Sequence, residues 1–220
     1  MIEYDKNAIV PDYITKWLRD NQTHNDELLH SMEEYARENH IPIAEPETAS
    51  FLSVMTSIIN PKSVLEIGTA IGYSSIIMAR AGKSAHILSL EYNSDIIPVA
   101  RENIHLAGLD ERITVCEADA KDYLSFLSDD ESFDMIFLDG PKGHYYYMLD
   151  DCIRLLKKGG VLISDNVLYK GMTADDEHII KRKETIVSRL RDYITALTNA
   201  PELKTSLLPL GDGVTISVKK

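Results

Sequence analysis

From residue 63 onwards the chain alternates short apolar runs with amphipathic stretches of helical length, and this alternation constrains its fold most strongly. We expect strands in the apolar runs that begin at residues 63, 86, 113, 133 and 161, with helices between them. Such alternation builds βαβ units and therefore a parallel, doubly wound sheet. Two more strand candidates, 203–208 and 214–218, are separated by a short turn and should form an antiparallel hairpin. The prediction is an α/β fold whose seven-stranded sheet is mostly parallel, with one antiparallel C-terminal strand.

Two boundaries in the second half depend on local signals. The helix predicted over 144–156 should end at the turn Lys157-Lys-Gly-Gly160, before the strand at 161. After that strand a long helix is predicted from about Asp176 to Thr198.

The N-terminal part of the chain has a different pattern, which is helical. Asn25 and Asp26 are candidates for the start of one of its helices. No internal repeat or flexible linker interrupts the chain. We therefore expect a single domain over residues 1–220, with a helical segment over 1–60 and a Rossmann-like core over 61–220.

Composition indicates the compartment. The N-terminus lacks the basic start, apolar core and cleavage site of a secretory signal, and no apolar run has the length of a membrane span. The two cysteines, Cys116 and Cys152, lie beside apolar positions and are expected to be buried, reduced thiols. A cytoplasmic protein without a membrane partner is predicted.

The net charge of −12 argues against nucleic-acid binding over the whole surface, because phosphates are bound by clustered lysines and arginines. A local basic patch is still available in the segment from Lys170 to Arg191. Its cations are Lys170, Lys181, Arg182, Lys183, Arg189 and Arg191. They could contact phosphates, or they could form a solvated helix face. Nearby tyrosines could stack on a base or pack between helices: Tyr145, Tyr146, Tyr147 and Tyr169.

A glycine-rich turn, Gly68-Thr-Ala-Ile-Gly72, follows the first apolar run, and Glu66 stands two residues before it. Ligands bind outside the carboxyl ends of strands in open α/β sheets, and glycines there let a ligand approach backbone N–H groups. The spacing is not the G-x-G-x-x-G of dinucleotide sites, and the acid suits a ligand with a positively charged end. A purely structural tight turn would explain the glycines equally well.

Acids also follow the second and third apolar runs. Glu91 stands at a distance from Gly72 at which an acid accepts hydrogen bonds from ribose hydroxyls. Asp119 ends the next run and could meet an adenine amino group. These two acids indicate a nucleoside, and a nicotinamide cofactor would fit them as well.

The most specific feature follows the fourth and fifth runs, which end in Asp139 and in Asp165-Asn166. Two carboxylates and an amide oxygen at neighbouring strand ends form a hard ligand set, which suits Mg²⁺, Mn²⁺ or Ca²⁺ and is poor for zinc. Three protein ligands would leave an octahedral ion open to water and to two substrate oxygens. Lys142 lies in the same loop and could serve as a base. The alternative is that Asp165 and Asn166 only cap a turn.

Three segments that contain these residues resemble the motifs of the cation-dependent O-methyltransferases, the family of catechol and caffeoyl-CoA O-methyltransferases. They are VLEIGTAIGYS at 64–74, FLDGPK at 137–142 and ISDNV at 163–167. The resemblance extends from about Pro42 to the turn at Gly211. Two further segments, IPIAEPET at 41–48 and the basic KRKETIV at 181–187, resemble the bacterial branch that methylates 5-hydroxyuridine in tRNA.

The resemblance implies roles for individual residues. It implies a metal site of Asp139, Asp165 and Asn166, with Lys142 and Asp139 as catalytic residues. For S-adenosylmethionine (SAM) it implies a site of Ala44, Glu66, Gly68, Gly72, Tyr73, Ser74, Glu91, Asp119, Ala120 and Asp139.

The predicted activity is therefore that of a Mg²⁺-dependent SAM O-methyltransferase, with Mn²⁺ or Ca²⁺ as alternative ions. The expected substrate is 5-hydroxyuridine in the tRNA anticodon loop, which would become 5-methoxyuridine. A small-molecule enzyme acting on catechol-type compounds shares every core motif and stays open as an alternative. An NAD-binding oxidoreductase is a more remote one, since it should carry G-x-G-x-x-G. The family tends to dimerise, so we expect a homodimer with Trp17 and the N-terminal helices at its surface.

Overall fold

The computed structural model describes residues 9–22, 26–128 and 130–220. Its strands are β1 (Ser63–Ile67), β2 (His86–Glu91), β3 (Ile113–Glu117), β4 (Phe133–Leu138), β5 (Leu156–Ser164), β6 (Leu203–Leu208) and β7 (Val214–Lys219). Its α-helices are α1 (Asp12–Asp20), α2 (Glu27–Glu38), α3 (Pro46–Ile59), α4 (Tyr73–Ala81), α5 (Ile97–Leu106), α6 (Ala120–Phe126), α7 (Tyr145–Leu155) and α8 (Glu184–Asn199). Short 3₁₀ turns are η1 (Lys142–His144), η2 (Asp176–His178) and η3 (Lys181–Lys183).

The strands form one seven-stranded sheet in the order β3-β2-β1-β4-β5-β7-β6. Strands β1 to β5 pair in parallel, whereas β7 runs antiparallel to both of its neighbours, β5 and β6. The chain therefore reverses direction once in the sheet, at the C-terminal hairpin. This confirms the predicted fold class, including the single antiparallel strand.

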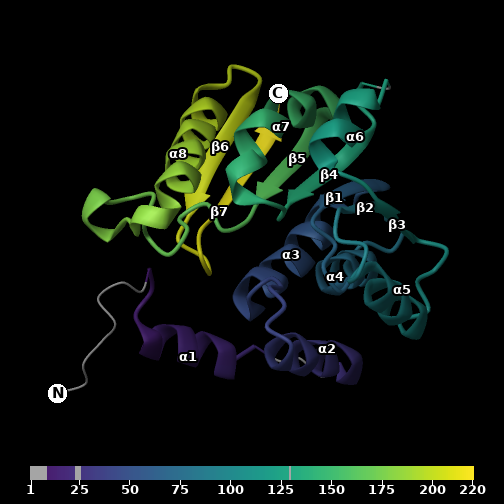
Figure 1. Cartoon of the computed structure of the whole chain (residues 1–220). Coiled ribbons are helices and arrows are strands. Elements are labelled where there is room, and N and C mark those ends of the chain that lie inside the picture. Colours follow the sequence, from purple (N-terminus) through teal and green to yellow (C-terminus); the bar gives the residue numbers. More distant parts are fainter. Residues whose placement is uncertain (1–8, 23–25, 129) are drawn as a thin grey trace.

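Helices cover both faces of the sheet, with α3, α4 and α5 on one side and α6, α7 and α8 on the other (Figure 1). Successive strand residues point to opposite faces, so Val64 and Phe137 join the first layer while Leu65 and Leu138 join the second. Each such buried side chain contributes about 1.5–3 kcal/mol to stability. The two apolar layers fix the strands, and with them the loops at the strands' carboxyl ends.

The N-terminal helices follow the predicted pattern. Asp26 caps α2, because its carboxylate accepts hydrogen bonds from the backbone N–H groups of Leu28 and Leu29, both at 3.1 Å. Asn25, the other candidate for this helix start, lies outside the described residues. Helix α3 ends at Asn60, which has a left-handed backbone with φ of 48°.

Two predicted boundaries were wrong. Strand β5 starts at Leu156 and includes the predicted turn 157–160, because a shift in register between Phe133 and Met135 lets Phe133 pair with Leu156. The last helix starts at Glu184 instead of Asp176. Before it, the Asp175 carboxylate caps a 3₁₀ turn by accepting from the N–H of Glu177, which competes with regular helix.

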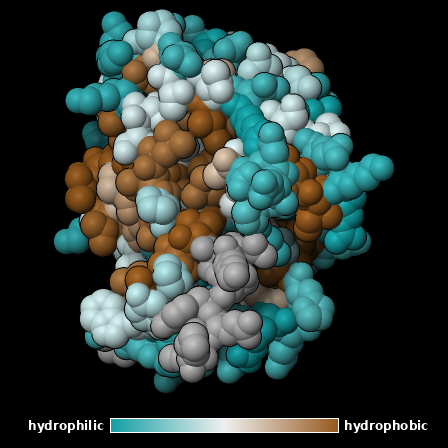
Figure 2. Space-filling model, turned by 90° about the vertical axis from the view of Figure 1, so that its left-hand side faces the viewer, coloured by the Kyte–Doolittle hydropathy of each residue, from teal (hydrophilic) through white to brown (hydrophobic). Residues whose placement is uncertain are grey.

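Both cysteines are free thiols; Cys152 is buried as expected, but Cys116 is partly exposed. In the stretches 9–22, 26–128 and 130–220, no helix combines the length and apolar character needed to cross a membrane. On the face drawn in Figure 2, apolar side chains gather across the middle and polar ones surround them.

Candidate active site

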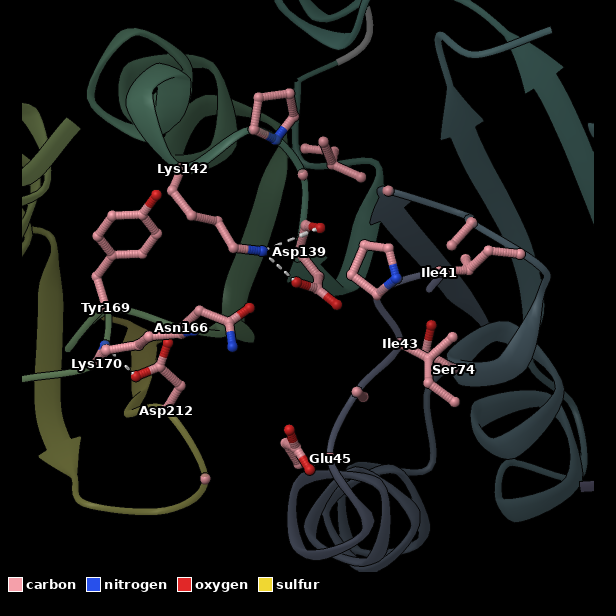
Figure 3. A pocket seen from close by; sticks show the side chains of 18 of the residues that line it. Ile41, Ile43, Glu45, Ser74, Asp139, Lys142, Asn166, Tyr169, Lys170 and Asp212 are labelled. Carbon is pink, nitrogen blue, oxygen red and sulfur yellow. Dashed lines mark hydrogen bonds and ion pairs between the residues drawn. The ribbon is translucent and has the colours of Figure 1, made fainter. Parts of the chain in front are cut away.

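A cleft of about 1660 Å³ opens at the carboxyl ends of the parallel strands. Its walls come from α1, the segment 40–47, the loops that follow β1 to β5, and the turn 209–212. Figure 3 shows how side chains from these separate segments converge on one space. The predicted residues Ala44, Gly68, Tyr73, Ser74, Glu91, Asp119, Ala120, Asp139, Lys142 and Asn166 line it. Glu66, Gly72 and Asp165 lie behind this wall.

The turn after β1 packs directly against the end of β4. Gly68 has a φ of +103°, and a Cβ there would lie 2.5 Å from the carbonyl oxygen of Asp139. The N–H of Asp139 in turn donates to the carbonyl of Ile67 at 2.9 Å. Only glycine allows this close approach, so the glycine turn positions Asp139. Gly72, with φ of +86°, precedes α4 and approaches the backbone of Ala100.

Glu66 is fully buried and does not reach the cleft. Its carboxylate accepts hydrogen bonds from the hydroxyls of Ser74, at 2.5 Å, and of Ser75 and Ser89. Burial raises the pKa of Glu66 to about 7, against the opposing effect of the three hydroxyls. Glu66 therefore orients Ser74, which does line the cleft, and would act on a ligand through it.

Tyr73 and Ala44 bring the N-terminal segment to the cleft. The Tyr73 side chain is buried, and its hydroxyl donates to the Glu33 carboxylate of α2 at 2.5 Å. This hydrogen bond turns the polar end of Tyr73 towards α2 and leaves the ring for the cleft. Ala44, also buried, lines the cleft as well.

Glu91 already accepts three backbone hydrogen bonds. Its Oε1 accepts from the N–H groups of Tyr92 and Asn93, and its Oε2 accepts from Ala70 at 3.0 Å. Because a carboxylate offers about four lone-pair sites, room remains for about one further donor. A single ribose hydroxyl fits this geometry better than the pair expected from the sequence. Asp119 caps α6 by accepting from the N–H of Lys121, and Ala120 lies beside it in the cleft wall.

The three residues predicted as metal ligands lie at the adjacent ends of β4 and β5. The N–H of Asp165 donates to the carbonyl of Leu138 at 3.0 Å, which places it beside Asp139. The buried hydroxyl of Tyr145 bridges the same strand ends, donating to the carbonyls of Leu138 at 3.0 Å or Asp165 at 3.2 Å. Sequence analysis considered Tyr145 for base stacking, but the structure makes it an internal support of this site.

Asp165 is 1% exposed, and among the described residues its carboxylate forms no ion pair, since Lys142 pairs with Asp139. Its Oδ1 accepts the N–H of Asn166 at 2.7 Å, and Asn166 has a left-handed φ of 55°. Burial, and next the nearby Asp139 carboxylate, raise the pKa of Asp165. A buried acid next to a second acid is stabilised by a cation, so the donor set fits a hard divalent ion.

Lys142 is the cation that the structure places there. Its Nζ lies 2.5 Å from Oδ1 of Asp139, and Figure 3 shows the side chain extended towards that carboxylate. Within the described part of the chain, no three His, Cys, Asp or Glu side chains gather as a metal site. The predicted set contains only two carboxylates, with the Asn166 amide as its third member.

Two features of the cleft were not predicted from the sequence. Arg19 of α1 pairs with Glu45 at 2.6 Å and with Glu47 at 2.9 Å, which ties α1 to the start of α3 at the cleft wall. The Asp212 carboxylate accepts the backbone N–H of Lys170 and faces the cleft from the far side. The turn containing Asp212 was recognised only as a connection between strands. Nothing in the local sequence around Arg19 indicated its partners.

The chain is similar to known proteins over most of its length. A family model described as O-methyltransferase matches residues 20–220. A caffeoyl-CoA O-methyltransferase of Medicago sativa is 33% identical over 179 residues, which covers 77% of this chain and 72% of that protein.

Solved structures agree with this match. A protein from Staphylococcus aureus, assigned as a caffeoyl-CoA O-methyltransferase, has a TM-score of 0.87 and 31% identity, and the match covers 95% of this chain and all of that one. An O-methyltransferase from Bacillus cereus in complex with SAH has a TM-score of 0.83 and 26% identity, with 94% of this chain and 97% of that one covered.

Proposed function

The chain belongs to the O-methyltransferase family of SAM-dependent enzymes, and on this basis we propose that it methylates 5-hydroxyuridine in tRNA with the help of a divalent cation. The observation that carries the proposal is the convergence of Asp139, Asp165 and Asn166 beside a cleft of SAM-binding type. SAM would occupy the part of the cleft between Ser74, Glu91 and Asp119. The cation would lie at the ends of β4 and β5.

The cation, Mg²⁺ or alternatively Mn²⁺ or Ca²⁺, would acidify and orient the hydroxyl that receives the methyl group. Asp139, Asp165 and Asn166 would hold it, and Tyr145 keeps the two strand ends in register. Lys142, which lies beside Asp139, would be close to the substrate hydroxyl and in its neutral amine form could accept the proton. Asp139 would thus belong both to the cation site and to the edge of the SAM site.

The residues that follow β1 and β2 would position SAM in the cleft. Glu66 fixes Ser74 beneath the methionine end, and Glu91 orders the backbone around the ribose. Helix α1 and the segment 40–47 line the cleft and would help to exclude water from the reaction.

5-Hydroxyuridine offers the 5-hydroxyl and the neighbouring 4-carbonyl as a pair of oxygens for a hard cation. The similarity of two segments to the tRNA-modifying branch supports this substrate. Catechol-type small molecules are the second candidate, and they are favoured by the caffeoyl-CoA relatives. Both candidates use the same reaction and the same cation.

The experiment that separates them supplies the protein with labelled SAM and Mg²⁺, together with tRNA containing 5-hydroxyuridine or with a catechol. The proposal expects label in the RNA as 5-methoxyuridine. Label in the catechol alone would reject the tRNA substrate and would support the small-molecule alternative.

A homodimer remains part of the proposal. Trp17 on α1 is 62% exposed, and apolar side chains gather on the face in Figure 2; buried contact surfaces between subunits have this character. Light scattering should therefore give about twice the mass of 24.8 kDa. A monomeric mass at micromolar concentration would contradict it.

A further inference from the structure

We propose that Lys121, Tyr147 and Arg189, here called the Tyr147 cluster, bind the phosphate backbone of the substrate RNA beside the target nucleotide. This inference rests on the proposed function and adds the surface by which the RNA is held. The cluster brings together the starts of α6 and α7 and the middle of α8.

The cluster is built around one aromatic ring. Lys121 Nζ lies 5.9 Å and Arg189 Cζ 5.4 Å from the ring centroid of Tyr147. Tyr146 contacts the same ring edge-on at 5.8 Å, while its own side chain stays partly exposed. Each cation is attracted to the ring, so Tyr147 holds two positive charges near one another.

These two cations lack the usual partners. Among the residues that the structure describes, neither Lys121 nor Arg189 pairs with a carboxylate, and the Arg189 guanidinium donates its hydrogen bond to the carbonyl of Gly143 at 3.5 Å. The chain has 35 acidic and 23 basic residues, so unpaired neighbouring cations are unexpected by composition. Two like charges held together are stabilised by an anion.

The cluster also lies at the edge of the cleft. Lys121 lines the cleft next to Ala120, and Gly143, which contacts Arg189, follows Lys142 directly. Lys121 is exposed, as is Tyr147 at 48%, and Arg189 is partly exposed, so an anion can reach the cluster from solvent. A strand whose target base enters the cleft would pass its phosphates over this surface.

Part of the basic segment from Lys170 to Arg191 has a structural role and is not free to contact RNA. Arg191 pairs with Asp176 at 2.6 Å and donates to the carbonyl of Thr173 at 2.9 Å, so it anchors the loop before α8. Lys183 lies 5.6 Å from the ring centroid of Tyr169, which lines the cleft, and it extends the positive edge. The Tyr147 cluster, with Lys121 from another helix, replaces the continuous run 181–191 as the main RNA contact.

The test measures methyl transfer from labelled SAM to two substrates, an anticodon stem-loop with 5-hydroxyuridine and the free nucleoside. The variants are Arg189→Gln, Lys121→Gln and Tyr147→Leu. Lys83→Gln is the matched control, because Lys83 is an exposed lysine on the turn before β2, at the amino ends of the strands and so away from the cleft. Thermal melting checks that each variant is folded.

We expect KM for the stem-loop to rise about tenfold in Arg189→Gln and Lys121→Gln, with kcat at saturation within about twofold of wild type. The slope of log KM against log salt should fall by about one for each cation removed. Tyr147→Leu should raise KM as well, because the cations lose the ring that places them. Transfer to the free nucleoside should be unchanged in Arg189→Gln, and Lys83→Gln should behave as wild type.

Failure of this inference and failure of the proposed function give different results. A wild-type enzyme that methylates the stem-loop, with variants of unchanged KM and salt slope, would overturn the Tyr147 cluster alone. Variants that lose transfer to the nucleoside as strongly as to the RNA would also overturn it. A wild-type enzyme that methylates a catechol or a CoA thioester and no RNA would overturn the proposed function.

Discussion

The ammonium of Lys142 lies 2.5 Å from the carboxylate of Asp139. Asp139 precedes Lys142 by three residues and directly follows β4, the strand that pairs with β5. The pair is largely shielded from solvent, with side chains 19% and 15% exposed. Lys142 is therefore held at the point where a substrate hydroxyl would meet the cation site. The ammonium itself cannot accept a proton, so Lys142 would act as the base only after it has released its own proton, in the neutral amine form.

Lys142→Met should lower kcat about 100-fold, the lower end of what a positioned acid or base contributes. Affinity for SAM should change little, because Lys142 faces the substrate side of the cleft. Lys158→Met, on an exposed lysine early in β5, is the matched control. Steady-state kinetics with labelled SAM measure both variants. A kcat at the wild-type level in Lys142→Met would remove Lys142 from the mechanism.

Glu66 should make the stability of the protein depend on pH. The pKa of Glu66 is about 7 in the folded protein, against an ordinary value of 4.5, so the folded state binds this proton more tightly than the unfolded state does. The resulting stabilisation is complete below pH 4.5 and is lost as pH rises through about 7. At 1.36 kcal/mol per pKa unit, the loss is about 3 kcal/mol.

Glu66→Gln lacks this proton and should not show the loss. Urea unfolding of the protein without SAM, at several pH values from 4.5 to 8, gives the free energy of unfolding for both proteins. The free energy of unfolding of the wild type minus that of the variant should fall by about 3 kcal/mol as pH rises across that range. A difference that is constant with pH would show that Glu66 is ionised in the folded state throughout.

Gly68→Ala should destabilise the fold strongly. The new Cβ would collide with the carbonyl of Asp139 at 2.5 Å, and φ at this position is +103°. Backbone strain and overpacking together should lower the free energy of unfolding by about 3 kcal/mol. Gly108→Ala is the control, since φ there is +66° but nothing lies within 4 Å; it should cost about 1 kcal/mol. Equal urea midpoints for the two variants would contradict the packing argument.

Arg19 should hold α1 in place at the cleft wall. Its guanidinium joins Glu45 and Glu47, and Glu47 is only 7% exposed. Losing these ion pairs should cost roughly 1 kcal/mol, so hydrogen exchange in α1 should accelerate about fivefold in Arg19→Ala. Lys16→Ala is the matched control, because Lys16 pairs only with Asp20 of the same helix. Equal hydrogen exchange in α1 of both variants would show that the ion pairs of Arg19 do not hold α1 in place.

The fold could be predicted because its determinants are local in the sequence. Apolar runs such as 133–138 and the glycine turn at Gly68 are visible without partners, and all seven strands were placed. The acids at the strand ends were found for the same reason, since the end of a parallel strand is a fixed place in the fold. What depends on contacts between distant segments was missed.

Three misses illustrate this. The early start of β5 depends on its pairing with Phe133, which the turn-like Lys-Lys-Gly-Gly sequence conceals. Tyr145 looks like its neighbours Tyr146 and Tyr147, and only packing shows that it is the internal one. Lys121 lies far along the chain from Arg189, so their common ring contact leaves no signal in the sequence.

The central claim is that a divalent cation held by Asp139, Asp165 and Asn166 drives methyl transfer to 5-hydroxyuridine. The most direct measurement is the rate of transfer from labelled SAM to a stem-loop with that nucleotide, after chelation and after Mg²⁺ is restored, in wild type and Asp165→Asn. We predict that chelation lowers the wild-type rate about 100-fold and Mg²⁺ restores it, while Asp165→Asn still binds SAM but stays slow in both conditions. A wild-type rate that survives chelation, or full activity in Asp165→Asn, would contradict the account.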